Sequence, residues 1–276
     1  LEGISTLDIV KIQKHILGKE TFSEPWQYLA ADVTNDHRVT ASDISALRKL
    51  ILGVDSKYLN NLSWKFIEGN YVFPVKDDPW AESFNEKYQI QSLPGDMMYL
   101  DFRGIKVGDV SKDMWDLLSS GQARSAQDAV LRAEVAGDGS RIAFKAAETF
   151  EMEGFQCWLE FNHDQMHAVG VQPGAISLQE NQINWMFADN GLLPISWNSE
   201  QKKHVEAGEV LFYLLTDREV NQEIVAKMAF NVGRIRPELY LASGETKNLV
   251  LESRESDIAK QVVFKQLLPN PFTDQA

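Results

Sequence analysis

Two stretches near the N-terminus share one pattern of apolar and polar positions. Apolar residues recur at intervals of three and four along 9–17 and again along 44–52, and a glycine follows each stretch, at Gly18 and Gly53. This periodicity gives a helix one apolar face, and glycine after the last turn favours a helix end. The pattern therefore predicts one amphipathic helix, present twice at a constant offset, although an ordinary helical hairpin would explain the apolar spacing alone.

The period changes to two in the second half of the chain. Over 129–250, short apolar runs alternate with polar positions and are separated by turn residues at short intervals. In one run, Phe155 and Cys157 would share a face, while Gln156 and Trp158 would share the opposite one. Such alternation predicts an antiparallel β-sandwich whose strands bury one face each.

A segment rich in aromatic residues, Pro, Gly and Asn separates these two patterns. We expect residues 63–112 to form an irregular extension that packs on the helices. Residues 113–128 contain Ser119-Ser120-Gly121, which is typical of a linker. Aromatic side chains on loops can also form a sugar-binding platform, so the extension keeps two interpretations.

The loop before the second helix carries oxygen-bearing residues at regular intervals. Positions 1, 3, 5, 7, 9 and 12 of a calcium-binding EF-hand loop supply its ligands, position 7 through its carbonyl. The residues at these positions are Asp32, Thr34, Asp36, Arg38, Thr40 and Asp43. Position 12 is Asp where Glu is usual, and position 6 is His37 where Gly is usual. The alternative is a plain turn in which Thr40 or Asp43 caps the helix.

Paired loop–helix repeats with Asp at position 12 and an Ile-Leu-Gly ending resemble a dockerin, in particular the divergent form in large secreted proteins of Bacteroidetes-like bacteria. The resemblance implies Ca²⁺ as cofactor and residues 1–62 as a dockerin-like calcium-binding repeat. In the first repeat, Gly3, Ser5 and Asp8 match loop positions 7, 9 and 12 and imply a second calcium site. We expect whatever supplied its positions 1 and 3 to lie upstream of Leu1.

The strand-rich part carries a second resemblance. Gly154-Phe155-Gln156, the run 170–176 and the run 208–214 are similar to motifs of a cohesin-type sandwich. This resemblance implies that residues 129–256 form an immunoglobulin-like or cohesin-like β-sandwich. The predicted fold class is therefore α + β and multidomain, with a small EF-hand-like α domain followed by an antiparallel sandwich.

The C-terminal end carries a third resemblance. Leu268-Pro269-Asn270-Pro271-Phe272, preceded by Val262-Val263-Phe264, is similar to the opening strand of the C-terminal sorting domain of type IX secretion substrates. This implies that residues 257–276 are a linker and the start of that domain. We expect the chain to be an internal piece of a polypeptide that is secreted or displayed on the cell surface, with the type IX secretion machinery as a partner.

Composition and charge narrow the choice of partners. The chain has 27 Lys and Arg against 40 Asp and Glu, a formal net charge of −13. Such a field does not attract nucleic-acid phosphates or anionic lipid, so we expect neither as a partner. The sequence has no apolar run of about eighteen residues, which argues against membrane insertion. Cys157 is the only cysteine, which excludes an internal disulfide and a thiolate zinc cluster.

The sequence does not indicate an enzyme. His163 and His167 are spaced to face one metal on a helix, but the residues around them alternate with period two. The chain has no Gly-x-Ser-x-Gly elbow, phosphate loop or dinucleotide-binding glycine pattern. Carboxylates such as Asp101 and Glu148 have no fixed separation that would predict glycoside hydrolysis.

We therefore expect a calcium-stabilised, non-enzymatic structural or adhesive module, and the alternative is a carbohydrate-binding module with a glycan as its ligand. Loop positions 10 and 11 are Thr6-Leu7 in one repeat and Ala41-Ser42 in the other. The two repeats thus carry different residues at these positions. This difference disfavours a cellulosome-type partner and favours docking of the two modules in cis. At their junction we expect an apolar cluster around Trp80, Phe102 and Trp115.

Overall fold

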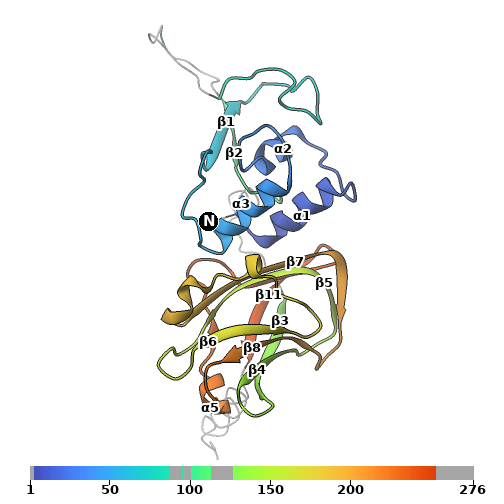
Figure 1. Ribbon diagram of the computed structural model, residues 1–276. Helices are drawn as coiled ribbons and strands as arrows, with labels where there is room; N and C mark the ends of the chain where they lie inside the picture. Colours follow the sequence, from blue (N-terminus) through green and yellow to red (C-terminus); the bar gives the residue numbers. More distant parts are fainter. Residues whose placement is uncertain (1–2, 87–91, 93–94, 96–100, 113–126, 253–276) are drawn as a thin grey trace, which may run out of the picture.

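The computed structural model describes residues 3–86, 92, 95, 101–112 and 127–252 (Figure 1). A helical part with a β-hairpin comes first, and a strand-rich part follows it. Trp115, nearly all of the expected linker 113–128 and all of the expected segment 257–276 lie outside the described residues. None of the described helices is long and apolar enough to cross a bilayer.

The two expected helices are confirmed as α1 (Thr6–Ile16) and α3 (Ala41–Ile51). Each begins with a capping box, formed by Ser5 and Asp8 in α1 and by Thr40 and Asp43 in α3. A side chain at the cap and one three residues later satisfy backbone N–H groups that the first turn leaves without partners. A third helix, α2 (Pro25–Ala31), was not expected from the sequence. It starts at a proline, which suits the first helical position.

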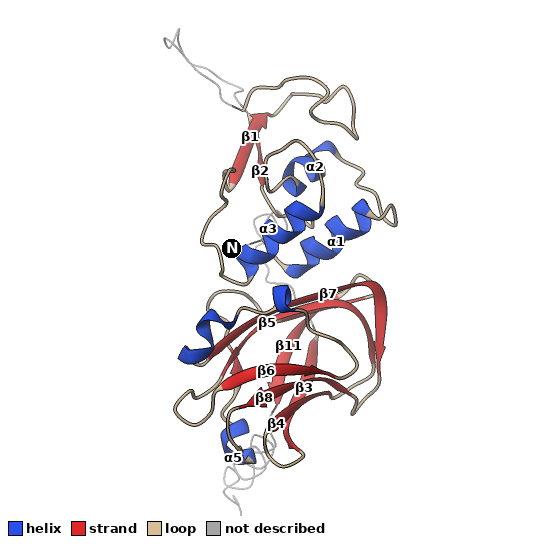
Figure 2. Ribbon diagram, in the orientation of Figure 1, coloured by secondary structure: helices blue, strands red, loops and turns tan. Residues whose placement is uncertain are grey.

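The helices share one hydrophobic core with the aromatic-rich segment. Strands β1 (Trp64–Glu68) and β2 (Phe102–Lys106) pair as an antiparallel hairpin, with Lys65 opposite Ile105. The buried core combines side chains from all of these elements: Ile9, Ile12, Leu29, Leu47, Ile51, Ile67, Ile105, Val107 and Val110. The hairpin and the residues that follow it are therefore part of the helical module (Figure 2).

The strand-rich part is one nine-stranded sheet in the order β6-β8-β4-β3-β11-β10-β5-β7, with β9 paired to β5. Its strands are β3 (Asp128–Ala136), β4 (Arg141–Ala146), β5 (Phe150–Glu160), β6 (Ala168–Pro173), β7 (Leu192–Val205), β8 (Val210–Thr216), β9 (Ala229–Phe230), β10 (Glu238–Leu241) and β11 (Thr246–Glu252). Short helical turns η1 (Glu180–Gln182), η2 (Trp185–Asn190) and α5 (Gln222–Val225) join them.

The sheet folds back on itself, so that β5 and β7 face β4 and β8 across one core (Figure 2). Phe144 and Phe212 stack at 4.7 Å between ring centroids, and Phe155 from the opposite layer reaches Phe212 at 6.4 Å. This is the β-sandwich that the period of two predicts. It is not wholly antiparallel, because β11 pairs with β3 in parallel. These are the last and first strands of the sandwich, and most of its chain separates them, so parallel pairing is sterically possible.

Strand β5 is buried on both faces instead of one. Phe155 and Cys157 point into the sandwich core, as expected. Gln156 and Trp158 on the opposite face are buried as well, and Trp158 belongs to the core of the helical module. The second face of β5 is therefore an interface between the two parts of the chain.

Candidate functional site

The loop between α2 and α3 is built around two fully buried carboxylates, Asp32 and Asp43. Asp32 accepts hydrogen bonds from the backbone N–H of Asp36 at 2.9 Å and of His37 at 3.1 Å. One oxygen of Asp43 accepts from Thr34 N and Thr34 Oγ1, both at 2.9 Å, and the other accepts from the N–H of the helix-capping residue Thr40 at 2.8 Å. The capping role and the expected calcium-ligand role therefore fall on the same carboxylate.

The electrostatics of this loop favour a cation. Burial raises the pKa of Asp32, the N–H groups of Asp36 and His37 lower it, and the nearby Asp43 carboxylate raises it again. Two buried anions side by side are stabilised by a dication between them. His37, at the position where glycine is usual, adopts the left-handed backbone that glycine favours, with φ of 64°. The substitution at position 6 therefore leaves the loop conformation intact.

The six expected ligands do not all converge. The Asp36 carboxylate is exposed and accepts a hydrogen bond from Arg38 N at 3.0 Å. Within the described part of the chain, no group of three or more His, Cys, Asp or Glu side chains is placed to hold a metal ion. The donor set nevertheless consists of carboxylate, hydroxyl and carbonyl oxygens, which are the ligands that calcium takes. Asp32, Asp43 and Thr34 form the part of it that is already gathered.

The first loop also centres on a buried carboxylate. Asp8 accepts hydrogen bonds from Ser5 N at 2.9 Å and, on its other oxygen, from Ser111 N at 2.9 Å. Gly3 adopts a positive φ of 80°. The residues that approach Asp8 thus include one that follows β2. The sequence analysis placed the residues for positions 1 and 3 upstream of Leu1 and did not anticipate that the fold returns a later segment to the start of α1.

Buried polar contacts join the helical module to the sandwich. Thr6 donates its N–H to Gln156 at 2.7 Å, and its hydroxyl lies 2.7 Å from that of Ser196. Asn198 accepts from Arg48 at 2.5 Å and donates to the Gln13 side chain at 2.6 Å. Two helix-end carbonyls accept from sandwich side chains, Ile51 from Trp158 at 3.3 Å and Leu52 from Asn184 at 3.0 Å.

The backbones of the two parts also approach closely. A Cβ atom on Gly154 of β5 would lie 3.3 Å from Val10 of α1 and 2.9 Å from the carbonyl oxygen of Trp197. A larger residue would therefore collide with β7 and would crowd Val10 of α1. Lys14 adds an ion pair with Glu153 at 2.9 Å. Helix α1 packs on β5 and β7, and α3 adds the contacts of Arg48 and the Ile51 carbonyl, so the chain's own sandwich covers this face of the helices (Figure 1).

The expectation that Trp80 and Phe102 contribute to an apolar cluster at the junction is wrong. Trp80 stacks with His37 at 5.7 Å between ring centroids, and Phe102 is 47% exposed on β2. The hairpin lies on the side of the helices away from the sandwich (Figure 1). The sequence analysis missed Thr6, Gln156, Ser196 and Asn198, and the one available signal was a tryptophan, Trp158, on the supposedly solvent-facing side of a strand.

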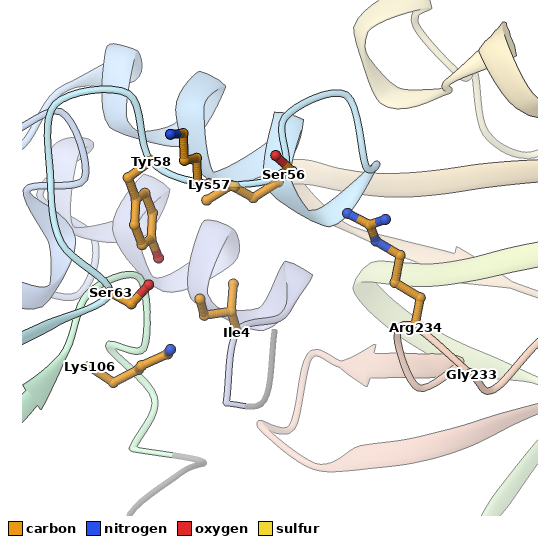
Figure 3. A pocket seen from close by; sticks show the side chains of 9 residues that line it. Ile4, Ser56, Lys57, Tyr58, Ser63, Lys106, Gly233 and Arg234 are labelled. Carbon is orange, nitrogen blue, oxygen red and sulfur yellow. The ribbon is translucent and has the colours of Figure 1, made fainter.

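A cavity of about 420 Å³ opens at the edge of this junction (Figure 3). It is lined by Ile4 and by side chains from both parts of the chain, including Lys57, Lys106 and Arg234. Arg234 also lies over the Trp158 ring at 5.3 Å. The cavity lining mixes these cationic side chains with apolar and hydroxyl-bearing ones, and Lys106 also lies over the Trp64 ring at 5.2 Å.

The residues that could have indicated an enzyme are dispersed. His167 pairs with Asp217 at 3.2 Å, and His163 lies near Asp164 at 3.5 Å, each with an exposed side chain. Burial raises the pKa of the Cys157 thiol far above its usual value, so the thiolate is not available as a nucleophile.

Comparison with known proteins finds one family match, in the N-terminal part. Residues 2–52 match the family model described as "Dockerin type I domain". No curated protein matches the chain. The fold is similar to a chain of a type I cohesin–dockerin complex from Clostridium thermocellum, with 14% identity, a TM-score of 0.33, and coverage of 48% of this chain and 94% of the other.

Two further solved structures are similar to this chain. The seventh ScaB type I cohesin from Pseudobacteroides cellulosolvens has 14% identity, a TM-score of 0.29, and coverage of 45% and 85%. A non-cellulosomal cohesin from Archaeoglobus fulgidus has 15% identity, a TM-score of 0.29, and coverage of 48% and 97%. Residues 2–52 are thus similar to dockerin type I domains, and a β-sandwich follows them in the chain.

Proposed function

We propose that this chain is a non-enzymatic structural or adhesive module of a large secreted cell-surface protein, in which the dockerin domain docks in cis on the sandwich. The observation that carries the proposal is the buried polar interface of α1 and α3 with β5 and β7. The match of residues 2–52 to the dockerin type I family supports protein docking as the activity, and this interface supports a partner within the same polypeptide.

The chemistry of the interface supports docking as a specific contact. Thr6, Gln156 and Ser196 are buried, and each is hydrogen-bonded across the junction. A buried polar group left without its partner costs about 1–3 kcal/mol. Because these groups pair with one another, the docked arrangement is favoured over other apolar contacts between the same surfaces.

Calcium binding is the second part of the proposal. Asp32, Thr34, Asp36, Thr40 and Asp43, with the Arg38 carbonyl, would hold one ion, and Gly3, Ser5 and Asp8 belong to a second loop. When bound, the ion cross-links the loop and neutralises its carboxylates. Asp32 and Asp43 hold the loop through backbone N–H groups, which aligns α3 for its contact with the sandwich.

Export is the third part. The Pro269 to Phe272 motif, which lies outside the described residues, supports a type IX secretion cargo of a Bacteroidetes-like bacterium. An extracellular location agrees with a calcium-stabilised docking module. Fractionation of the source cells tests this part, and a cytoplasmic product would contradict it.

Small-angle scattering of the full chain tests cis docking. We expect one compact separation of the two parts, which Val10→Glu should lengthen because Val10 is buried against β5. Ile16→Glu is the matched control, since Ile16 is 40% exposed on the same helix. A broad ensemble of separations in the parent chain, or strong binding in trans between the separately expressed halves of different molecules, would contradict the proposal.

One observation supports the alternative function, a carbohydrate-binding module. The outer face of the hairpin carries Trp64, Phe66 and Phe102, and Phe66 is 52% exposed. Trp64 and Phe66 stack at 6.3 Å between ring centroids, opposite Gly104 and Lys106. Exposed rings of this kind can stack on sugars. A glycan array that gives a signal lost in Phe66→Ala would support this function, and a docking module should give none.

A further inference from the structure

The segment that follows β2 lies against the start of α1. Ser111 donates its N–H to Asp8 at 2.9 Å, although 103 positions separate them, and its hydroxyl lies 3.2 Å from an Asp109 oxygen. Gly108 donates its N–H to the Ala30 carbonyl at 2.8 Å. The segment is therefore bonded to both α1 and α2.

The same hydrogen bond occurs inside the second loop. Thr34 donates its N–H to Asp43 at 2.9 Å. Asp43 and Asp8 occupy equivalent positions, since each is the third residue of its helix and the second partner of its capping box. Ser111 thus donates its backbone N–H to Asp8 in the same way as Thr34 donates its N–H to Asp43.

The match extends along both segments. Residues 108–112 read Gly-Asp-Val-Ser-Lys, and residues 31–35 read Ala-Asp-Val-Thr-Asn. Their central valines are buried, Val110 at 1% and Val33 at 2% exposure. Their aspartates are buried as well. The last residue of each adopts a left-handed backbone, with φ of 68° at Lys112 and 61° at Asn35.

Residues 108–112 pack tightly against the core of the helical module. A Cβ atom on Gly108, whose φ is 91°, would lie 2.8 Å from both the Leu47 side chain and the Tyr58 hydroxyl. Glycine is required by both the backbone angle and the space. The packing of Gly108 against Leu47 and Tyr58 therefore positions Asp109 and Ser111 close to Asp8.

We infer that residues 108–112 are the missing first half of the N-terminal loop, so that the first repeat is completed by a segment about a hundred residues downstream. Asp109 and Ser111 then stand at loop positions 1 and 3, with Gly3, Ser5 and Asp8 at positions 7, 9 and 12. The cation-binding part of this inference rests on the proposed calcium function: the split loop would hold a second hard divalent cation, with Asp8 and Asp109 as its carboxylates. The completion of the repeat does not depend on metal.

Amide hydrogen exchange of the full chain in chelator tests the completion. Asp8→Ala should speed exchange at the Ser111 amide roughly tenfold or more, the equivalent of a hydrogen bond to a charged acceptor, and leave the Thr34 amide slow. Asp43→Ala should do the reverse. Ser111→Ala keeps the N–H and should leave its protection intact. An unprotected Ser111 amide in the parent chain, or one indifferent to Asp8→Ala, would overturn the inference.

Calcium titration by calorimetry and native mass spectrometry tests the cation. We expect two ions in the parent chain, one in Asp109→Asn, one in Asp32→Asn and none in the double variant. The same ion count in Asp109→Asn as in the parent would overturn the second site. Binding of no ion at all, with the amide results as expected, would overturn the calcium function and leave the completed repeat standing.

Discussion

At the residue scale, buried polar side chains carry most of what is specific to this chain. Asp8, Asp32 and Asp43 are buried carboxylates that receive backbone N–H groups and hold their loops in shape. For Asp32, burial raises the pKa, and the hydrogen bonds from the Asp36 and His37 N–H groups lower it. We expect a cation to bind at the loop of Asp32 and Asp43, because it would neutralise these two carboxylates without disturbing their hydrogen bonds.

Calcium should therefore stabilise the helical module. At a concentration about a hundredfold above the dissociation constant, binding to one site raises the free energy of unfolding by about 2.7 kcal/mol. Thermal unfolding with calcium and with chelator measures this difference. Asp32→Ala should lose the response, and Asp217→Ala, remote from the loops in the sequence, should keep it. If the parent chain melts at the same temperature with calcium and with chelator, the loop is only a turn that caps α3.

His15 should make the helical module sensitive to acid. Its ring stacks on Phe22 at 4.1 Å, its Nδ1 accepts the Phe22 N–H at 3.1 Å, and burial lowers its pKa below 6.5. The folded state therefore binds the proton less readily than the unfolded state. The stability from this site is complete above the unfolded pKa and is lost as pH falls below about 6.5.

Melting temperatures across this range test the prediction. His15→Asn keeps a hydrogen-bond acceptor and does not titrate, so its pH dependence should be flatter than that of the parent. His163→Gln, at an exposed position, should retain the dependence of the parent chain. Identical slopes for His15→Asn and the parent would show that His15 is not responsible.

At the element scale, β5 and α1 decide how the two parts meet. Strand β5 faces the sandwich core on one side and the helices on the other. Each side chain at its centre therefore packs either in the sandwich core or against the helical module. Helix α1 uses its apolar stripe for the helical core and its first turn for Gln156 and Ser196. An amphipathic helix with a second, polar contact face is therefore the connecting element.

Thr6 and Ser196 should be energetically coupled across the junction. Thr6→Val or Ser196→Ala alone leaves the other buried hydroxyl without its partner and should cost about 1–3 kcal/mol. The double variant should recover part of that loss, with a coupling energy of about 0.5–1.5 kcal/mol. Denaturant unfolding of the four proteins closes the cycle. Strictly additive effects would mean that the two hydroxyls do not interact in solution.

At the scale of the whole molecule, the chain is a helical module seated on one layer of a sandwich. The helical core and the sandwich core are distinct clusters, and Trp158 from β5 belongs to the helical one. Shared side chains of this kind couple the stability of the two parts, since unfolding of either exposes surface of the other.

Scanning calorimetry should detect this coupling. Val10→Glu should lower the melting temperature of the helical part more than that of the sandwich, because the sandwich retains its own core. Ile16→Glu should leave both transitions near those of the parent. If Val10→Glu changes neither transition, the two parts are stable without the interface.

The sequence by itself determined the features that depend on neighbours in the chain. The apolar spacing of α1 and α3, the Asp and Thr spacing of the second loop, and the alternation along β5 are local patterns, and local backbone geometry converts each into a helix, a loop or a strand face. The alternation along β5 predicts one core face only, since periodicity shows that a strand has two faces but not what covers the second.

Only the tertiary structure decided the pairings between distant segments. The contact of Ser111 with Asp8, the parallel pairing of β11 with β3, and the contact of Thr6 with Gln156 each join positions more than a hundred residues apart. No local propensity encodes such a contact, because its stability comes from burying matched groups after the chain has closed a long loop. The first loop became complete only through that closure, which returns residues 108–112 to the start of the chain.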